Sequence, residues 1–160
     1  MGLIDKLFGK FFGNSDGKAR LSEPTTNDYM ARWEKERQQR IQAAESRLKD
    51  WVIASVKEKG SLSFSWESGN DEAFVTFKDS TEMEEENYQD LEEYIVDKLD
   101  IPDAGEFEMT GSGTVYIDGN LVRAKYTSTM KAIIDYDEGT EKEVYSEEEE
   151  DSGDKVLFTL

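Results

Sequence analysis

Residues 61–66 read Ser-Leu-Ser-Phe-Ser-Trp, so that serine alternates strictly with a large apolar side chain. A period of two places the apolar side chains on one face of a β-strand and the serines on the other. Residues 67–71 supply a turn, and residues 74–77 (Phe-Val-Thr-Phe) supply a return strand. Residues 61–78 are therefore predicted to form a β-hairpin with one buried face.

A helical pattern lies on each side of this hairpin. Residues 28–59 carry apolar side chains along one stripe, which Arg37 interrupts, and Gly60 follows as the expected C-terminal stop. Residues 81–100 carry a second apolar stripe, with Thr81 as the expected N-cap. We therefore expect a long helix whose first turns project beyond the core, and a shorter helix after the hairpin.

The C-terminal third has the pattern of antiparallel strands. The candidates are residues 106–117, 121–136, 141–146 and 155–160. A tight turn at residues 118–120 joins the first two, the second is expected to bend near residues 127–129, and the acidic run 147–154 is expected to stay a solvated loop. These elements predict an α+β fold, in which a mostly antiparallel sheet carries two helices on one face.

Residues 1–12 form an amphipathic pattern at the start of the chain. Six apolar side chains fall on one helical face: Leu3, Ile4, Leu7, Phe8, Phe11 and Phe12. A helix this short is unstable alone in water, so we expect it to dock on its own domain, on a partner or on a membrane surface. Residues 13–27 are expected to be a flexible linker, with Thr26 or Asn27 as the cap of the following helix. Residues 28–160 would then form one acidic α+β domain.

The chain has 160 residues and contains neither cysteine nor histidine. This composition excludes disulfides, thiolate nucleophiles and every site that depends on histidine. Residues 111–114 (Gly-Ser-Gly-Thr) lack the lysine and the helix of a phosphate-binding loop and are expected to form a strand bend or bulge. Residues 135–141 match a calcium loop poorly. We therefore expect no catalytic residues, no metal site and no cofactor.

Acidic residues are unevenly distributed along the chain. It has 37 Asp and Glu against 19 Lys and Arg, a net charge of -18, and the surplus lies in residues 58–160. The residues that we expect to bind a partner are Glu82, Glu84, Glu85, Glu86, Glu92, Glu93, Asp135, Asp137 and Glu138. A surface of this charge repels nucleic acid and anionic lipid and speeds the capture of basic proteins. The alternative is that the acidity only serves solubility.

These features favour a small non-enzymatic inhibitor of the immunity or anti-defence type. Its acidic domain would bind a basic partner, such as a toxin or nuclease, and would not bind nucleic acid directly. The alternative is an adaptor or secretion-chaperone-like protein that docks a partner or a membrane surface through residues 1–12. No apolar run is long enough to span a membrane and no secretory signal is recognised, so we expect a cytoplasmic protein, with peripheral contact at the inner membrane surface as the alternative. The partner's identity and the oligomeric state stay open.

Overall fold

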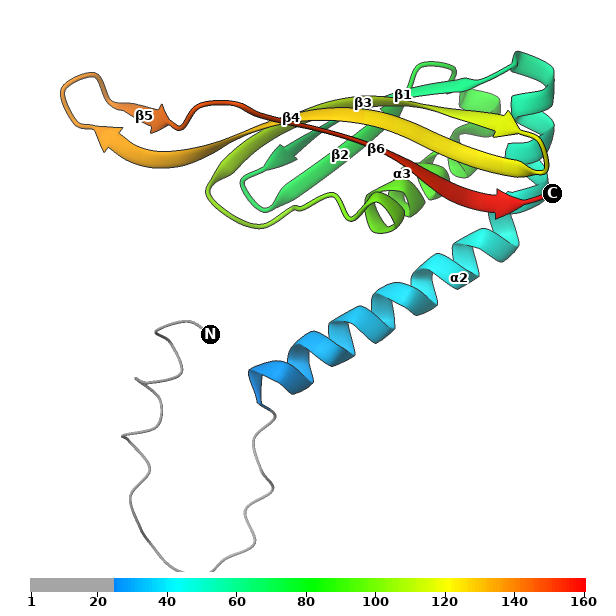
Figure 1. The fold of residues 1–160 in the computed structure, drawn as a ribbon, viewed down its shortest axis with the longest axis horizontal. Helices are drawn as coiled ribbons and strands as arrows, with labels where there is room; N and C mark the ends of the chain where they lie inside the picture. The colour runs from blue at the N-terminus through cyan, green and yellow to red at the C-terminus, as the bar shows by residue number, and fades with distance from the viewer. Residues whose placement is uncertain (1–24) are drawn as a thin grey trace, which may run out of the picture. The chain divides into compact units, whose positions relative to one another are not determined.

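The computed structural model describes residues 25–160 of the chain, which form two helices, a short 3-10 turn and six strands (Figure 1). The elements are α2 (Thr26–Lys59), β1 (Leu62–Gly69), β2 (Glu72–Phe77), η1 (Glu82–Glu84), α3 (Glu85–Leu99), β3 (Phe107–Asp118), β4 (Leu121–Asp137), β5 (Lys142–Tyr145) and β6 (Glu149–Thr159). All strand pairs in the described chain are antiparallel, so the predicted α+β fold is confirmed. The predictions for residues 1–12 and 13–24 lie outside the described residues.

The sheet lies within one compact unit, Trp33–Leu160. Its strand order is β2-β1-β3-β4, and β4 also pairs with β6 along residues 121–130 and with β5 along residues 133–137. Because β4 is the longest strand of the described chain, it extends beyond the start of its neighbour β3 and continues into the hairpin with β5.

Tight turns of the types predicted from the sequence join the first strand pairs. Asn70 and Asp71 form the two-residue turn between β1 and β2, and both have a positive φ (52° and 63°). That is the pattern of a type I′ turn, which matches the twist of the flanking strands. Between β3 and β4, Gly119 has a φ of 60°, a conformation that glycine adopts without steric cost.

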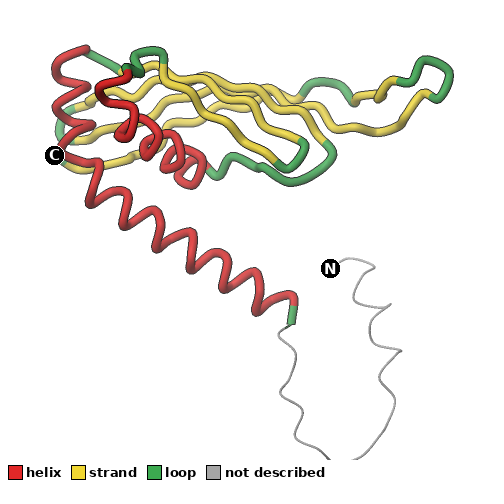
Figure 2. The backbone as a smooth tube through the Cα atoms, turned by 180° about the vertical axis from the view of Figure 1, so that it is seen from behind, coloured by secondary structure: helices red, strands yellow, loops and turns green. Residues whose placement is uncertain are grey.

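Both helices pack on one face of the sheet (Figure 2). Val52 of α2 and Ile95 of α3 are fully buried in one core cluster with Leu62, Val115 and Val122 of the sheet. Burying a side chain of this kind stabilises the fold by about 1.5–3 kcal/mol. On the opposite face, one hydroxyl side chain from each of five strands forms a solvent-exposed row: Thr76, Ser65, Ser112, Thr127 and Ser152. The alternation of residues 61–66 therefore decides which face of the sheet is buried.

Two glycines of β3 make room for the aromatic side chains of β1. Gly111 pairs with Trp66 and Gly113 pairs with Phe64, and a Cβ on either glycine would overlap the ring of its partner. The two aromatic side chains therefore pack against bare backbone and are almost fully buried. The register between β1 and β3 is regular here, so the bend or bulge expected at residues 111–114 is wrong. Close packing of aromatic rings requires these glycines.

Arg37 explains why the apolar stripe of α2 is interrupted. Its Nε and Nη2 donate to the carbonyl oxygen of Asp97 at 3.0 and 2.7 Å, and Nη2 lies 3.3 Å from Asp100 Oδ1. The last carbonyls of a helix have no partner within it and form the negative end of its dipole. Arg37 therefore caps the C-terminus of α3, and its side chain is only 12% exposed.

The helix α2 begins at Thr26, inside the stretch that the sequence predicts as linker. Thr25 is the reason, because its Oγ1 accepts the N–H of Asp28 (3.4 Å) while Asp28 Oδ2 accepts the N–H of Thr25 (2.9 Å). The Asp28 N–H also donates to the Thr25 carbonyl at 2.9 Å, so Thr25 supplies both partners of this amide, and Asp28 satisfies the N–H of Thr25 in return. The expected caps, Thr26 and Asn27, are instead the first helical residues.

The strand β4 differs from its prediction in where it is irregular. Its register with β3 is regular across residues 127–129, where a bend was expected. The register shifts lie between Val122 and Arg123, opposite β6, and between Ile133 and Asp135, opposite β5. The second shift falls where β3 has ended and β5 has become the partner, so the change of partner strand accommodates it.

The strand β6 begins earlier than predicted, inside the acidic run 147–154. Its first residue, Glu149, pairs with Met130, and the two residues that follow also face uncharged partners on β4. No like charges therefore stand directly opposite one another in this ladder. The pairing with β4 overrides the local preference of an acidic run for solvated loop.

Candidate functional site

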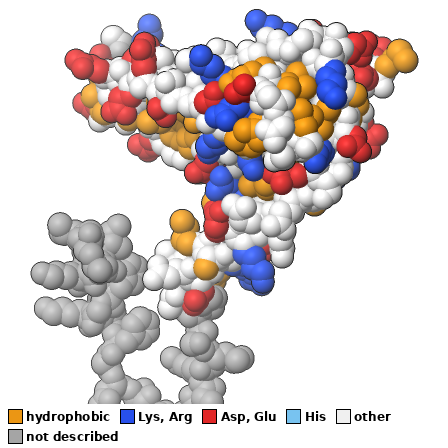
Figure 3. Space-filling model, turned by 45° about the vertical axis from the view of Figure 1, so that its right-hand side comes forward, with side chains coloured by type: hydrophobic (Ala, Val, Ile, Leu, Met, Phe, Trp, Pro, Cys, Tyr) orange, Lys and Arg blue, Asp and Glu red, His pale blue; other side chains and the backbone are white. Residues whose placement is uncertain are grey.

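One end of the sheet brings together three segments that are far apart in the sequence. The β1–β2 turn lies beside the start of β3, because Ser68 pairs with Met109. The start of β3 in turn lies beside β4, because Phe107 pairs with Ala132. We call residues 69–72, 105–108 and 131–150 the acidic end, since they contain thirteen Asp or Glu, two Lys and no Arg. In Figure 3 the carboxylates of this region are seen at the upper left.

A β-hairpin projects from the acidic end. It consists of the last residues of β4 and all of β5, and Figures 1 and 2 show that it extends beyond β1, β2 and β3. We call residues 133–145 the arm. Three apolar side chains of the arm are exposed to solvent: Ile134 (64%), Tyr136 (54%) and Val144 (39%). The arm therefore offers apolar contact area among its carboxylates.

A groove of about 650 Å³ lies between the arm, the β1–β2 turn and the segment before β3. Its lining residues include four carboxylates: Asp71, Glu106, Asp135 and Glu143. Ile134 and Tyr136 complete the arm side of the groove, and neither Lys nor Arg lines it. Among the described residues, no cation forms an ion pair with Asp71, Glu106 or Asp135. The groove is thus an open cavity whose carboxylates are uncompensated.

Glu143 of the groove and two further carboxylates of the acidic end are held in a network around Tyr145. The Tyr145 hydroxyl lies 2.6 Å from Glu143 Oε2 and 2.8 Å from Glu108 Oε1, and the two carboxylates share its single proton. Both contacts raise the pKa of Tyr145 above its ordinary value. Lys131 lies 3.8 Å from Glu108 Oε2, 4.0 Å from Glu148 Oε1 and over the Tyr145 ring. This network orients the arm, and it uses one of the two lysines of the acidic end.

The tip of the arm is fixed by Asp137. Its Oδ1 accepts the backbone N–H of Gly139 (2.8 Å) and of Thr140 (3.3 Å). The Thr140 hydroxyl and these two amides lower the pKa of the Asp137 carboxyl below its usual value. Asp137 therefore stays ionised to lower pH than a free carboxyl and builds the turn. Both Asp137 and Glu138 are exposed.

The predicted residues on α3 and η1 lie elsewhere in the fold. Glu84 accepts the indole N–H of Trp51 (3.2 Å) and lies 3.6 Å from Lys59. Lys59 ends α2 shortly before β1 begins at Leu62, whereas the acidic end begins where β1 ends at Gly69, so these carboxylates lie toward the other end of the sheet. Glu84 is thus structural, and the three acids around it are exposed: Glu82, Glu85 and Glu86. The predicted cap Thr81 makes no side-chain cap hydrogen bond, and the 3-10 turn η1 precedes α3 instead.

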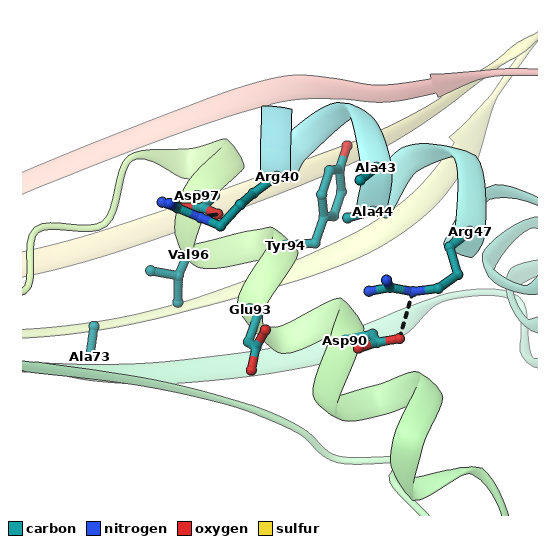
Figure 4. A pocket seen from close by; sticks show the side chains of 10 residues that line it. All are labelled: Arg40, Ala43, Ala44, Arg47, Ala73, Asp90, Glu93, Tyr94, Val96 and Asp97. Atoms are coloured by element: carbon teal, nitrogen blue, oxygen red, sulfur yellow. Dashed lines mark hydrogen bonds and ion pairs between the residues drawn. The ribbon is translucent and has the colours of Figure 1, made fainter. Parts of the chain in front are cut away.

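Glu92 and Glu93 are adjacent in sequence but differ in environment. Glu92 Oε1 accepts the backbone N–H of Phe77 on the edge strand β2 (3.3 Å), and burial raises the pKa of this carboxyl. Glu93 is exposed and lines a second groove, of about 410 Å³, between α2 and α3 (Figure 4). Glu92 therefore protects a strand edge, and only Glu93 is free to meet a partner.

The second groove is lined by three carboxylates and two arginines. Its two arginines are paired with carboxylates of α3: Arg40 Nε lies 3.0 Å from Asp97 Oδ2, and Arg47 Nε lies 2.8 Å from Asp90 Oδ2 (Figure 4). These pairs join the two helices, as Tyr94 does by donating to Glu45 Oε1 at 3.0 Å. This groove is therefore part of the helix packing and lacks the charge surplus of the acidic end.

Comparisons of the chain with protein-family models, with curated proteins and with solved structures give no match. In the part of the chain that the structure describes, no group of acidic side chains is arranged to hold a metal ion. None of the described helices combines the length and the apolar character needed to cross a membrane. The function is therefore inferred from the acidic end itself.

The sequence named only part of this site. Asp135, Asp137 and Glu138 lie on the arm as members of the predicted set, but the groove also uses Asp71 and Glu106. No signal in the sequence indicated either, because counting alternate strand directions from the predicted hairpin would place the β1–β2 turn and the arm at opposite ends of the sheet. The segment that contains α3 returns the chain to the acidic end, so β2 and β3 both run antiparallel to β1.

Proposed function

We propose that this protein is a non-enzymatic acidic binding protein that captures a basic protein through its acidic end. The observation that carries the proposal is the convergence of three segments with thirteen carboxylates and two lysines around an open groove. Like charges gathered on one surface create a field that attracts a basic partner and raises its association rate. The exposed apolar side chains of the arm then supply contact area that holds the complex together.

We further propose that capture inhibits the partner, as in an immunity or anti-defence protein. A nuclease or a nucleic-acid-binding toxin holds phosphates through Lys and Arg on its surface. An acidic surface that covers those side chains competes directly with nucleic acid for them. The same charge argues against direct nucleic-acid binding by this chain.

The test is a pull-down from native lysate with the full chain and two matched triple variants. The first variant carries Asp71→Asn, Glu106→Gln and Asp135→Asn in the groove. The control removes the same number of charges from η1 and α3 with the substitutions E82Q, E85Q and E86Q. Circular dichroism checks that both variants keep the fold. Asparagine is favoured in the turn at position 71, so this change leaves the hairpin intact.

We expect the groove variant to capture the basic partner about tenfold more weakly, because three partly exposed ion pairs at about 0.5 kcal/mol each sum to about one decade in affinity. The control variant should capture it normally. Raising the salt from 0.1 M to 1 M shortens the screening length from about 10 Å to about 3 Å and should release the partner. Loss of capture in the control variant alone would mean that the partner binds at η1 and α3 and not at the groove. Capture by all three proteins at both salt concentrations would refute a charge-based function.

Inhibition is tested on the captured partner once mass spectrometry has identified it. Its activity on nucleic acid should fall as the chain is added up to one equivalent, and the groove variant should inhibit less. The adaptor alternative and its membrane contact depend on residues 1–12, outside the described residues, so both stay predictions. The cytoplasmic location stays a prediction too.

A further inference from the structure

The arm contains a strand edge that lacks a partner strand. The ladder between β3 and β4 ends at the pair Phe107 and Ala132, and the last bond across it is the Ile133 N–H donating to the Glu106 carbonyl at 2.9 Å. On the preceding residue the Ala132 carbonyl accepts the N–H of Ser146, so this connection lies on the other side of β4. Residues 135–137 thus pair with β5 on one side, and Ile134 lies at the register shift before them. No described strand pairs with residues 134–137 on the side that β3 has left.

This open edge borders the acidic groove. Ile133, Ile134, Asp135 and Tyr136 form one wall of the groove, and the β1–β2 turn and Glu106 contribute to the rest. An incoming strand would extend the line of β3 and lie about 4.8 Å from β4. The Tyr136 N–H already donates to Asp135 Oδ1 at 2.8 Å, so the main chain of the incoming strand would meet the carbonyls of the edge and compete for this amide. Its alternate side chains would point toward the groove carboxylates.

The charge of the groove decides which segment fits this edge. Strand edges are protected in many proteins by charged side chains that repel a second copy. Two copies of this chain would bring two acidic ends together, with thirteen carboxylates on each. A segment rich in Lys and Arg would be attracted instead of repelled, because its positive charges complement Asp71, Glu106 and Asp135.

We infer that the open edge of β4 at residues 134–137 accepts an extended basic segment of the partner as an added β-strand. This inference rests on the proposed function and specifies how the partner is held. Charge brings the segment into the groove, and main-chain hydrogen bonds to the arm then fix its register. Ile134 and Tyr136 contact the apolar side chains that alternate with the basic ones.

The experiment uses the full chain, labelled with ¹⁵N, and two synthetic peptides of identical sequence in which Lys or Arg alternates with Val. One peptide has an ordinary backbone, and the other is N-methylated at every second residue, which keeps the charge but removes strand donors. Binding is followed by titration, and hydrogen exchange of the amides of residues 134–137 is measured with and without peptide. The groove and control triple variants described above are titrated in parallel.

We expect the ordinary peptide to bind and to slow exchange of at least one amide in residues 134–137. N-methylation should weaken binding about tenfold or more, because a main-chain hydrogen bond contributes about 0.5–1.5 kcal/mol and several are removed. The groove variant should bind the ordinary peptide more weakly, and the control variant should bind it normally.

Three results would overturn strand addition. Equal binding of both peptides, without slower exchange in the arm, would mean that charge alone holds the segment, and the proposed function would still stand. No binding of either peptide, while the basic partner is still captured through the groove carboxylates, would also leave the function standing. A dimer of the free chain in sedimentation, with slow exchange at the same amides, would assign the edge to a second copy. Failure of the proposed function itself is seen separately, in the pull-down: the groove variant would then capture the partner as well as the native chain does.

Discussion

The substitution Gly111→Ala should destabilise the fold, although glycine is normally the weaker residue in a strand. In the interior of a strand, alanine is more favourable than glycine by about 0.5–1 kcal/mol. Here the new methyl group would overlap the indole ring of Trp66, which is 3% exposed and packs against Phe64 and Tyr126 at ring distances of 6.0 Å. The ring has no room to retreat, so the overpacking cost lies near the upper end of its usual range, about 3 kcal/mol.

The net loss is therefore about 2 kcal/mol. For a domain of this size that loss lowers the melting temperature by about 6–8 °C. Urea denaturation followed by tryptophan fluorescence measures the loss directly. Ser112→Ala is the matched control, because residue 112 is the next residue of β3, faces solvent and should change stability by less than about 0.5 kcal/mol.

A double-mutant cycle with Trp66→Leu identifies the cause. The shorter side chain removes the overlap, so the double variant should be more stable than the sum of the two single changes implies, by about 1 kcal/mol or more. The reasoning is refuted if Gly111→Ala is as stable as the native chain, or if the two changes are additive. Either result would mean that the glycine is not required by the indole ring.

Two further substitutions test other parts of the fold. Arg37→Ala should cost about 1.5–3 kcal/mol in urea denaturation, because it leaves the Asp97 carbonyl at the C-terminus of α3 without its charged donor; an unchanged midpoint would contradict this capping role. Glu92→Gln keeps an acceptor for the Phe77 amide but removes a carboxylate whose pKa is raised by burial. A carboxyl with a raised folded-state pKa stabilises the fold below its unfolded pKa and loses that contribution as the pH rises through the folded value. The Gln variant should therefore gain stability relative to the native chain as the pH rises above the ordinary titration range of a glutamate side chain. The exposed neighbour provides the control, Glu93→Gln, and an equal gain there would assign the effect to net charge.

Local sequence patterns predicted the elements of this fold. They failed where contacts with residues distant in the sequence determine the local structure. The hairpin at residues 61–78 was predictable because alternation and turn residues are both local signals. Arg37 was visible only as a break in a stripe, because its partner, the Asp97 carbonyl, lies sixty residues away in the chain. Gly111 suggested a bend because nothing in its own segment indicates that the ring of Trp66 packs against it. The start of β6 was missed for the same reason, since β4 supplies the pairing.

The candidate site shows the same division. The sequence identified Asp135, Asp137 and Glu138 as parts of an acidic surface, but it gave the carboxylates of α3 equal standing. The fold separates these sets, because Glu84 and Glu92 are engaged in packing at other places. It also adds Asp71 and Glu106, whose importance depends on strand direction rather than on any motif.

The strand β4 runs without interruption from the middle of the sheet into the arm, and this continuity sets how the protein responds to mechanical tension. A force that pulls on the arm along its length acts on β4 parallel to the strand axis. That pull is resisted at once by the ladder to β3, from Phe107 to Asp118, and by the ladder to β6 on the other side. Hydrogen bonds loaded in shear give way together, whereas those peeled from one end break in sequence. The arm is therefore anchored in the direction in which a sheet is strongest.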